Sequence, residues 1–199
     1  MQTPLGLMSR RKAETAREIA AEASRLFADR GVAQVTAAEI AEAAGVSLRT
    51  FYRYFPTKED AVAPELEVGA ARWQAALREV DGDLAAAVPG VIRTMLTPTT
   101  AEEEASITRI RPLLRALAED RDLRAVWHRV NHESEETLVA LIQERGDRDR
   151  FGARVLAAAA TEAIRIGLEE WAESDAGLSG KGSPADVAVR VFAALAPRS

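Results

Sequence analysis

Apolar residues recur along most of this chain at the three- and four-residue spacing of an amphipathic helix. In the first such stretch, from about Arg11 to Asp29, the apolar stripe consists of Ile19, Ala23, Leu26 and Phe27. Together with local start and stop residues, this spacing predicts about nine helices. No stretch alternates apolar and polar residues as a half-buried strand does. The pattern therefore predicts an all-α fold.

Two short helices are predicted after the first one. Thr36 is an N-cap residue, and Glu39, three positions later, completes a capping box. Gly45 ends this helix, and Ser47 caps the next, which carries Leu48 to Tyr54. Further helices are expected from about Thr57 and over Asp83–Leu96, Ala101–Ala118, Leu123–Glu144, Phe151–Glu173 and Pro184–Leu195.

Three prolines fall inside predicted helices, namely Pro64, Pro89 and Pro112. Each removes a backbone hydrogen bond and should kink or break its helix. Pro64 lies on the fourth helix, which leads from the N-terminal segment into the rest of the chain. A kink there either transmits ligand binding along the chain or serves packing alone.

The composition limits the kinds of protein this can be. Of the 199 residues, 47% are apolar, enough to bury a core, and none is cysteine, which excludes disulfides and thiolate metal sites. Residues 1–9 lack the apolar core of a signal peptide, and the apolar run Val155–Ala160 is too short to span a bilayer. We therefore expect a soluble, cytoplasmic protein that does not enter a membrane.

Charge is distributed unevenly along the chain. Residues 1–60 hold nine Lys and Arg against eight Asp and Glu, a net +1, whereas the remainder holds seventeen against twenty-three, a net −6. A DNA-facing segment joined to an acidic remainder has this asymmetry, because phosphate attracts the first and repels the second. We place a domain boundary near residue 60.

The segment 36–55 has the residues that a helix-turn-helix requires. Gly45 accepts the left-handed turn conformation, and the small Ala41 lets two helices cross closely. The remaining polar residues of the second helix include two tyrosines, a threonine and two arginines, which bond phosphates and guanine edges. The alternative is a helical hairpin whose tyrosines only pack on the core. The buried side is expected to comprise Ile40, Ala44, Val46, Phe51 and Phe55.

Over about residues 11–60 the chain resembles the DNA-binding domain of the tetracycline-repressor family. The matching positions are Thr36, Gly45-Val46-Ser47, Thr50-Phe51-Tyr52-Arg53-Tyr54-Phe55 and Lys58. The resemblance implies a helix-turn-helix DNA-binding domain over residues 1–60, and over residues 61–199 a helical domain that dimerises and binds a small-molecule effector. It further implies a homodimeric repressor that the effector releases from a palindromic operator in double-stranded DNA.

Carried over by position, the resemblance assigns roles to single side chains. Leu48 and Arg49 would face base edges. The two residues that directly follow Thr36 are Ala37 and Ala38, whereas some members of the family have base-contacting polar groups there. Base contacts would therefore depend mainly on Arg49. Phosphate contacts fall to Thr36, Thr50, Tyr52, Tyr54 and Lys58. The full candidate DNA-binding set is Thr36, Ser47, Leu48, Arg49, Thr50, Tyr52, Arg53, Tyr54 and Lys58.

A basic cluster, Arg10 to Lys12, leads into the first helix. It either reaches phosphates or the minor groove as a flexible arm, or forms a solvated helix start.

The C-terminal helices are expected to enclose the effector pocket, although periodicity does not separate a pocket wall from core packing. Five arginines between positions 109 and 124 resemble, more loosely, a family branch that senses acyl-coenzyme-A-like ligands, whose phosphorylated headgroup arginines would suit. The alternative is a set of solvated arginines paired with neighbouring acidic residues. The candidate ligand-binding residues are Met95, Ile110, Arg111, Leu114, Trp127, Val130 and Arg165.

The dimer is expected to form through the last two helices, whose small alanines permit close approach. The expected seam consists of Val155, Leu156, Ala159, Ala163, Ile166 and Leu168 on one helix, with Val187, Val191, Phe192 and Leu195 on the other.

An enzyme is the less favoured class, because the chain has no phosphate loop, nucleophile elbow or acid–base motif, and we predict no cofactor. The enzyme alternative is a metal-dependent hydrolase built on His128 and His132, which fall at i and i+4 of one predicted helix. Such pairs are also typical of a solvated helix surface, and no third ligand is evident, so we predict no metal site. A DNA-binding protein without an effector is the other alternative.

Overall fold

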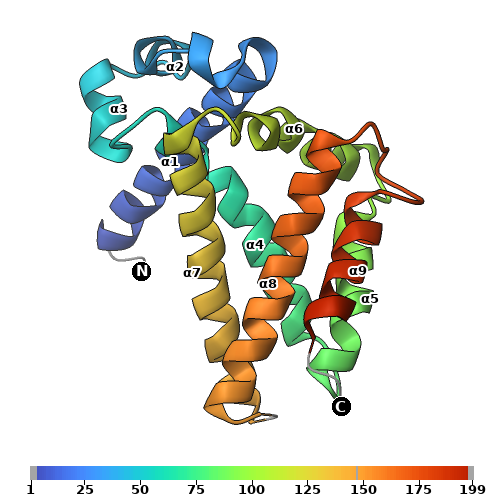
Figure 1. The fold of residues 1–199 in the computed structure, drawn as a ribbon. Coiled ribbons are helices and arrows are strands. Elements are labelled where there is room, and N and C mark those ends of the chain that lie inside the picture. The colour runs from blue at the N-terminus through green and yellow to red at the C-terminus, as the bar shows by residue number, and fades with distance from the viewer. Residues whose placement is uncertain (1–3, 147, 197–199) are drawn as a thin grey trace.

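The computed structural model describes residues 4–146 and 148–196, and these residues form nine α-helices and two short 3₁₀ helices without a strand (Figure 1). The all-α prediction is confirmed. The N-terminal elements are α1 (Pro4–Arg30), η1 (Val32–Gln34), α2 (Ala37–Ala43), α3 (Leu48–Tyr54) and η2 (Glu59–Val62). The C-terminal elements are α4 (Ala63–Arg78), α5 (Leu84–Leu96), α6 (Ala101–Ala116), α7 (Arg121–Arg145), α8 (Arg150–Glu173) and α9 (Pro184–Leu195).

The elements α1, α2 and α3 form a small N-terminal bundle at one end of the molecule (Figure 1). Its centre is made by Phe27 of α1, Ile40 of α2 and Phe51 of α3, each at most 1% exposed. The apolar stripe of α1 and the inner faces of α2 and α3 therefore meet as their spacing predicts. Beyond the bundle, α1 continues against α4 and α6, so the N-terminal helix contacts both parts of the molecule.

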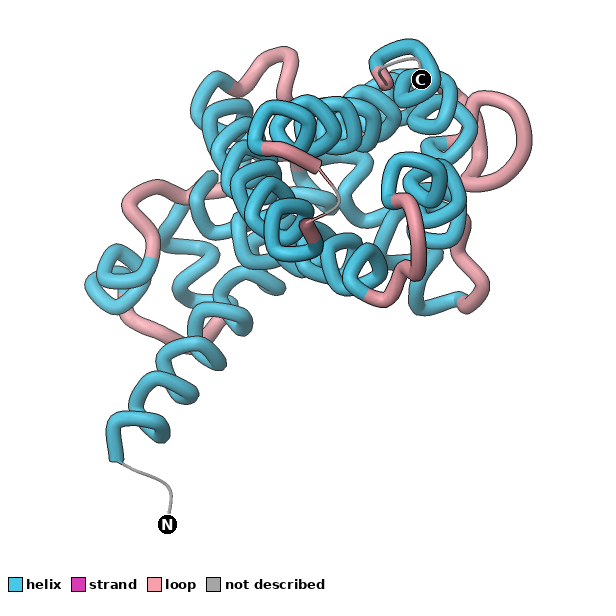
Figure 2. The backbone as a smooth tube through the Cα atoms, turned by 90° about the horizontal axis from the view of Figure 1, so that it is seen from below, coloured by secondary structure: helices cyan, strands magenta, loops and turns pink. Residues whose placement is uncertain are grey.

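The helices α4 to α9 form a larger C-terminal bundle, viewed nearly end-on in Figure 2. Within it, α8 contacts α5, α6, α7 and α9 and buries residues around most of its circumference. A close crossing lies between Gly167 of α8 and Ala188 of α9, where a Cβ added to the glycine would stand 2.6 Å from the alanine Cβ. No helix in the described part of the chain is long and apolar enough to cross a bilayer.

The N-terminal helix is longer than its apolar stripe predicts. It begins at Pro4 rather than near Arg11, and its first turns project away from the rest of the molecule (Figure 2). The basic cluster from Arg10 to Lys12 is exposed and helical. The cluster is thus part of the helix itself, and its contact with phosphates or the minor groove stays a prediction.

The prolines act differently from the prediction. Pro64 is the second residue of α4, where a backbone N–H has no partner within the helix, so it starts the helix and does not kink it. The turn that the sequence assigned to a helix from Thr57 is instead the 3₁₀ element η2. Pro89 and Pro112 do lie inside α5 and α6, and both helices continue past them.

Candidate nucleic-acid interface and ligand cavity

The turn between α2 and α3 is built by local capping. The Glu39 amide donates to Thr36 Oγ1 at 3.3 Å, and the Glu39 carboxylate accepts from the Thr36 amide at 2.8 Å, which completes the predicted capping box. Gly45 takes a φ of +66°, and Ser47 Oγ accepts from the Thr50 amide at 3.1 Å to begin α3. The predicted helix-turn-helix is confirmed together with its caps.

Arg30 adds a charge to this cap. Its guanidinium donates to Glu39 Oε1 at 2.8 Å and to the Gln34 carbonyl at 3.0 Å. The bonds from Thr36 and Arg30 hold the pKa of Glu39 at about 2. The Thr36 hydroxyl donates to Glu39 Oε2 at 2.8 Å. This exposed side chain, which is predicted to contact a DNA phosphate, therefore already has a partner in the cap.

Lys58 makes contacts within the N-terminal bundle that the sequence does not predict. Its ammonium donates to the carbonyls of Val32 and Val35 at 2.7 and 2.8 Å, and lies 3.6 Å from Glu59 Oε1. The side chain thus ties the chain after α3 to the loop before α2. Two of its three donors are used inside the N-terminal bundle, and its contact with phosphate stays a prediction.

The outward face of α3 carries Leu48, Arg49, Tyr52 and Arg53, which fall at i, i+1, i+4 and i+5 and are all exposed. Tyr52 is 53% exposed and rests edge-on against the buried Phe51, with 5.4 Å between ring centroids. The alternative in which the tyrosines only pack on the core is therefore wrong for Tyr52.

Two further candidates flank this face. Thr50 is half-buried, with its hydroxyl 3.0 Å from Ser47 Oγ. Tyr54 is half-buried against the core, and the guanidinium of Arg53 lies 5.3 Å from its ring centroid. On α2, Ala37 is buried and only Ala38 is exposed. Of the predicted set, α3 therefore gathers every member except Thr36 and Lys58, with Ser47 as its N-cap.

Residues 19–63, which contain this face and its caps, match the model of the bacterial regulatory proteins of the tetR family. Over this segment the chain is similar to the DNA-binding part of that family. The C-terminal helices from α5 onward and most of α4 lie outside the match. None of the curated proteins compared with the chain matches it.

Solved structures extend the likeness to the whole fold. A TetR-family transcriptional regulator from Syntrophomonas wolfei is 18% identical with a TM-score of 0.62, and the match covers 90% of this chain and 92% of the other. The TetR-family repressor AlkX from Dietzia is 23% identical with a TM-score of 0.59 over 90% and 94%. Thermus thermophilus FadR, solved with lauroyl-CoA, is 22% identical with a TM-score of 0.54 over 92% and 96%. The chain therefore has the fold of a TetR-family transcriptional regulator.

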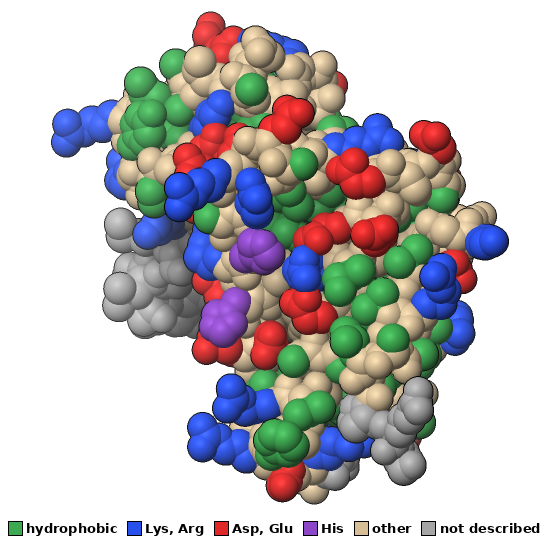
Figure 3. Space-filling view, viewed as in Figure 1, with side chains coloured by type: hydrophobic (Ala, Val, Ile, Leu, Met, Phe, Trp, Pro, Cys, Tyr) green, Lys and Arg blue, Asp and Glu red, His purple; other side chains and the backbone are tan. Residues whose placement is uncertain are grey.

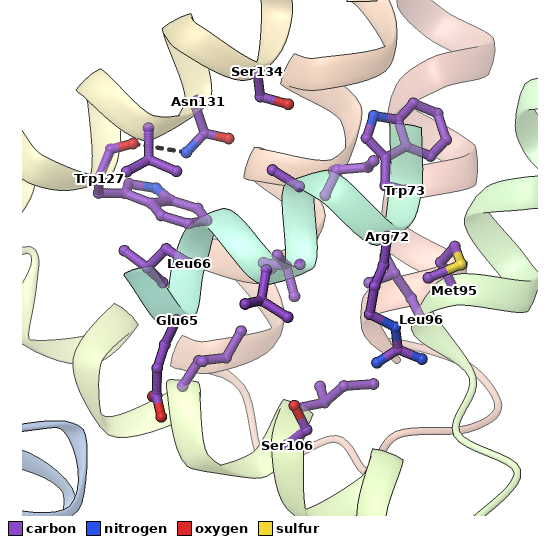
Figure 4. Close-up of a pocket in the computed structure, with 18 of the residues that line it drawn as sticks. Glu65, Leu66, Arg72, Trp73, Met95, Leu96, Ser106, Trp127, Asn131 and Ser134 are labelled. Carbon is purple, nitrogen blue, oxygen red and sulfur yellow. Dashed lines mark hydrogen bonds between the residues drawn. The ribbon is translucent and has the colours of Figure 1, made fainter. Parts of the chain in front are cut away.

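The C-terminal bundle contains a cavity of about 160 Å³ between α4, α5, α6, α7 and α8 (Figure 4). Four predicted ligand-binding residues line it, namely Met95, Ile110, Trp127 and Val130. That they bind a ligand stays a prediction. Sequence reasoning missed the α4 wall, which includes Leu66, Val68, Gly69 and Trp73. The apolar spacing of α4 was the available signal, but it does not distinguish a cavity from a core.

Three predicted ligand-binding residues lie elsewhere. Leu114 is buried in the core, away from the cavity lining. Arg111 stacks 4.5 Å from the ring centroid of Trp171 and donates to backbone carbonyls of Trp171 and Ser174 at the end of α8. Arg165 is bonded to two carboxylates of its own helix, including Glu169 at 2.7 Å. The contacts of Arg111 depend on distant helices, for which the sequence pattern has no signal, whereas the partners of Arg165 lie three and four positions away on its own helix, a spacing that the sequence does contain.

The arginine cluster does not form one anion site. Arg115 donates to the Ala172 carbonyl at 2.6 Å, so together with Arg111 it caps the C-terminal end of α8, where carbonyls lack helical partners. Arg109 lies 3.7 Å from Glu65, and Arg124 reaches the Ala118 carbonyl. Most of these arginines donate hydrogen bonds to backbone carbonyls. The structure therefore matches neither of the two alternatives, a set of solvated arginines paired with acidic residues or a site for a phosphorylated headgroup.

The expected dimer seam divides in two. Leu156, Ala159, Ala163, Leu168 and Phe192 are buried within the protomer, which corrects their assignment to the seam. Because α8 packs on several helices, its spacing does not separate internal contacts from external ones. Apolar side chains remain visible over α8 and α9 in Figure 3. The seam residues that keep exposed surface are Val155, Ile166, Val187, Val191 and Leu195.

The two histidines lie together on the outer surface of α7 (Figure 3). His128 and His132 are both exposed, and His132 Nε2 lies 3.7 Å from Glu136 Oε1. In residues 4–146 and 148–196, no three His, Cys, Asp or Glu side chains are placed to hold a metal ion together. The pair therefore has the surroundings of a solvated helix face.

Proposed function

We propose that this protein is a homodimeric repressor that binds a palindromic DNA operator through α3 and leaves it when a small effector fills the C-terminal cavity. Residues 1–60 would form the DNA-binding domain and residues 61–199 the effector-binding and dimerisation domain. The observation that carries the proposal is the exposed face of α3 with Arg49 and Tyr52 on its outer side. An arginine on such a face has the geometry to bond guanine in the major groove.

A second copy is needed because one short α3 contacts only a few base pairs. A two-fold dimer places a second α3 one helical turn of DNA away, so the operator has matching symmetry. The half-buried valines of α8 and α9, Val155, Val187 and Val191, supply an apolar face for this contact. Gly167 and Ala188 hold those two helices close within each protomer, so both present one surface.

The cavity supports control by a ligand. It lies between α4, which follows directly from the N-terminal bundle, and α6 and α7, so a ligand inside it would bear on the helix nearest to the DNA-binding segment. The effector would be a small hydrophobic molecule. The FadR relative was solved with lauroyl-CoA, but Arg111 and Arg165, which would bind such a headgroup here, already have partners.

Selection from randomised duplex DNA tests the proposal. We expect the protein to enrich a palindromic sequence, to bind it as a dimer in light scattering, and to lose its preference at one base pair of each half-site when Arg49 is replaced by alanine. Arg154→Ala, an exposed change on α8, is the matched control and should leave the enriched sequence unchanged. Enrichment of no sequence, or binding as a monomer, would contradict the proposal.

A further inference from the structure

Leu48 is an apolar side chain that is exposed on the outward face of α3. It is 43% exposed and lies directly beside Arg49, with Tyr52 one turn further along the same face. A single exposed leucine is ordinary on a protein surface, so its meaning depends on what surrounds it. In Figure 3 apolar side chains lie beside basic ones over α3. An apolar group is thus placed within the surface that is proposed to meet DNA.

The neutral polar groups next to Leu48 already bond one another. Ser47 Oγ accepts from the Thr50 amide at 3.1 Å, and the Thr50 hydroxyl lies 3.0 Å from Ser47 Oγ. On α2 the exposed Ala38 ends in a methyl group, so it offers no hydrogen bond to a base. Leu48 and Arg49 are therefore the longer side chains that the first turn of α3 presents outward.

The helix-turn-helix segment lacks the side chains that read adenine through an amide. Residues 36–55 contain neither Asn nor Gln, whose amides pair with N6 and N7 of adenine in the major groove. An A·T pair also presents the C5 methyl group of thymine in that groove, and an apolar side chain recognises it by contact. The segment is therefore equipped to recognise an A·T pair by the methyl group and not by an amide.

We infer that Leu48 recognises a thymine methyl group in each half-site of the operator, within two base pairs of the guanine that Arg49 binds. The inference rests on the proposed operator binding and adds the identity of a second base. The two residues are consecutive, so their Cα atoms are about 3.8 Å apart, close to the rise of about 3.4 Å between base pairs. Both side chains therefore reach the same base pair or neighbouring ones, and the contact removes apolar surface of the leucine and of the methyl group from water.

Selection from two DNA libraries tests this inference on the full chain. One library is randomised duplex DNA that contains thymidine. In the other, deoxyuridine replaces every thymidine, which removes the C5 methyl group and keeps the hydrogen-bonding groups of the base. We expect the first library to enrich a guanine with a thymine within two base pairs of it. The second should enrich the same guanine and lose the preference for the A·T pair.

Single substitutions in the selected duplex measure the contact by fluorescence anisotropy. Deoxyuridine in place of that thymine in one half-site should weaken binding about fourfold, the effect of one methyl group left out of contact. A duplex with 5-methylcytosine at the same position should bind more tightly than one with cytosine by a similar factor. The modified cytosine carries the methyl group without the hydrogen-bonding groups of thymine, so this comparison isolates the methyl contact.

Two variants of nearly equal length identify the side chain responsible. Leu48→Met keeps an apolar end and should retain the preference for thymine over deoxyuridine, whereas Leu48→Gln replaces that end by an amide and should lose it. Leucine, methionine and glutamine have similar helix propensities, and the side chain is exposed, so both variants should unfold at the same urea concentration as wild type. A difference between the variants therefore reports the contact with the base and not the stability of α3.

The outcomes separate this inference from the proposed function. Equal binding of the thymine and deoxyuridine duplexes by wild type would overturn the inference and leave the operator and the role of Arg49 intact. An undiminished preference for thymine in Leu48→Gln would also overturn it, because another side chain would then contact the methyl group. Enrichment of no sequence from the thymidine library would overturn the proposed function and this inference with it.

Discussion

Arg129 on α7 donates to Asp60 Oδ1 at 2.7 Å, and this ion pair joins the C-terminal bundle to the segment that leaves the N-terminal bundle. Asp60 lies in η2, and its other carboxylate oxygen accepts from the Thr57 hydroxyl at 3.0 Å. On either side of Arg129, Trp127 and Val130 line the cavity. One helix therefore forms a wall of the cavity and also contacts the chain that follows α3.

Arg129→Met should loosen this junction without unfolding the protein. The pair is partly exposed, so we expect global stability to fall by less than about 1 kcal/mol. Amide hydrogen exchange in η2 and the first turn of α4 should become faster, because these residues lose their contact with α7. Arg154→Met on α8 removes the same charge and should leave exchange in η2 unchanged. Equal exchange in all three proteins would show that the pair does not hold the junction.

Arg49→Ala and Tyr52→Phe should affect DNA binding in different ways. Loss of the arginine should cost about 1–3 kcal/mol and relax the preference at one base pair in each half-site. Loss of the tyrosine hydroxyl should weaken all sequences alike, since phosphate contacts carry no sequence information. The dependence of binding on salt should stay the same in Tyr52→Phe, because no charge is removed. Fluorescence anisotropy with operator and scrambled duplexes measures both effects.

Lys58→Met should destabilise the N-terminal bundle before it affects DNA contact. The change removes two hydrogen bonds to the backbone carbonyls of Val32 and Val35. We therefore expect the free energy of unfolding, measured in urea, to fall by about 1–3 kcal/mol. Lys181→Met, at an exposed loop position, is the matched control and should be nearly neutral. A fully stable Lys58→Met protein with weaker DNA binding would contradict this structural role and favour the predicted phosphate contact.

Glu39 should make stability depend on pH in the acidic range. Its pKa is about 2 in the folded protein and near 4.5 in the unfolded chain, so its contribution is complete above pH 4.5 and is lost as pH falls toward 2. Between pH 5 and pH 3 we therefore expect wild type to lose urea stability faster than Glu39→Gln. Glu42→Gln, exposed on the same helix, should follow wild type. Parallel curves for wild type and Glu39→Gln would contradict the assigned pKa.

Gly167→Ala should separate α8 from α9. The new Cβ would stand 2.6 Å from the Ala188 Cβ and 2.9 Å from its Cα, so one helix must shift, at a cost of about 1–3 kcal/mol. Because the dimer face spans both helices, dimerisation measured by sedimentation should weaken as well. Gly90→Ala on α5 is the control, since nothing lies within 4 Å of its new Cβ, and it should stabilise the protein by about 0.5–1 kcal/mol.

Local sequence was sufficient for most of the helices and for the turn that presents α3. The caps at Thr36, Ser47 and Ser183 and the left-handed Gly45 all act within three or four residues, so the pattern predicts them without the rest of the fold. The outward face of α3 follows from the same helical period. Pro64 was misplaced because whether a proline begins a helix or interrupts one depends on where the preceding turn ends.

Tertiary structure alone decided which residues share a site. Lys58 reaches carbonyls more than twenty positions earlier, and Arg111 reaches carbonyls about sixty positions later. The α4 wall of the cavity and the internal side of α8 have the same apolar period as any core helix. Periodicity records which side of a helix avoids water, whereas the partner on that side, whether core, cavity or second subunit, depends on how distant helices pack.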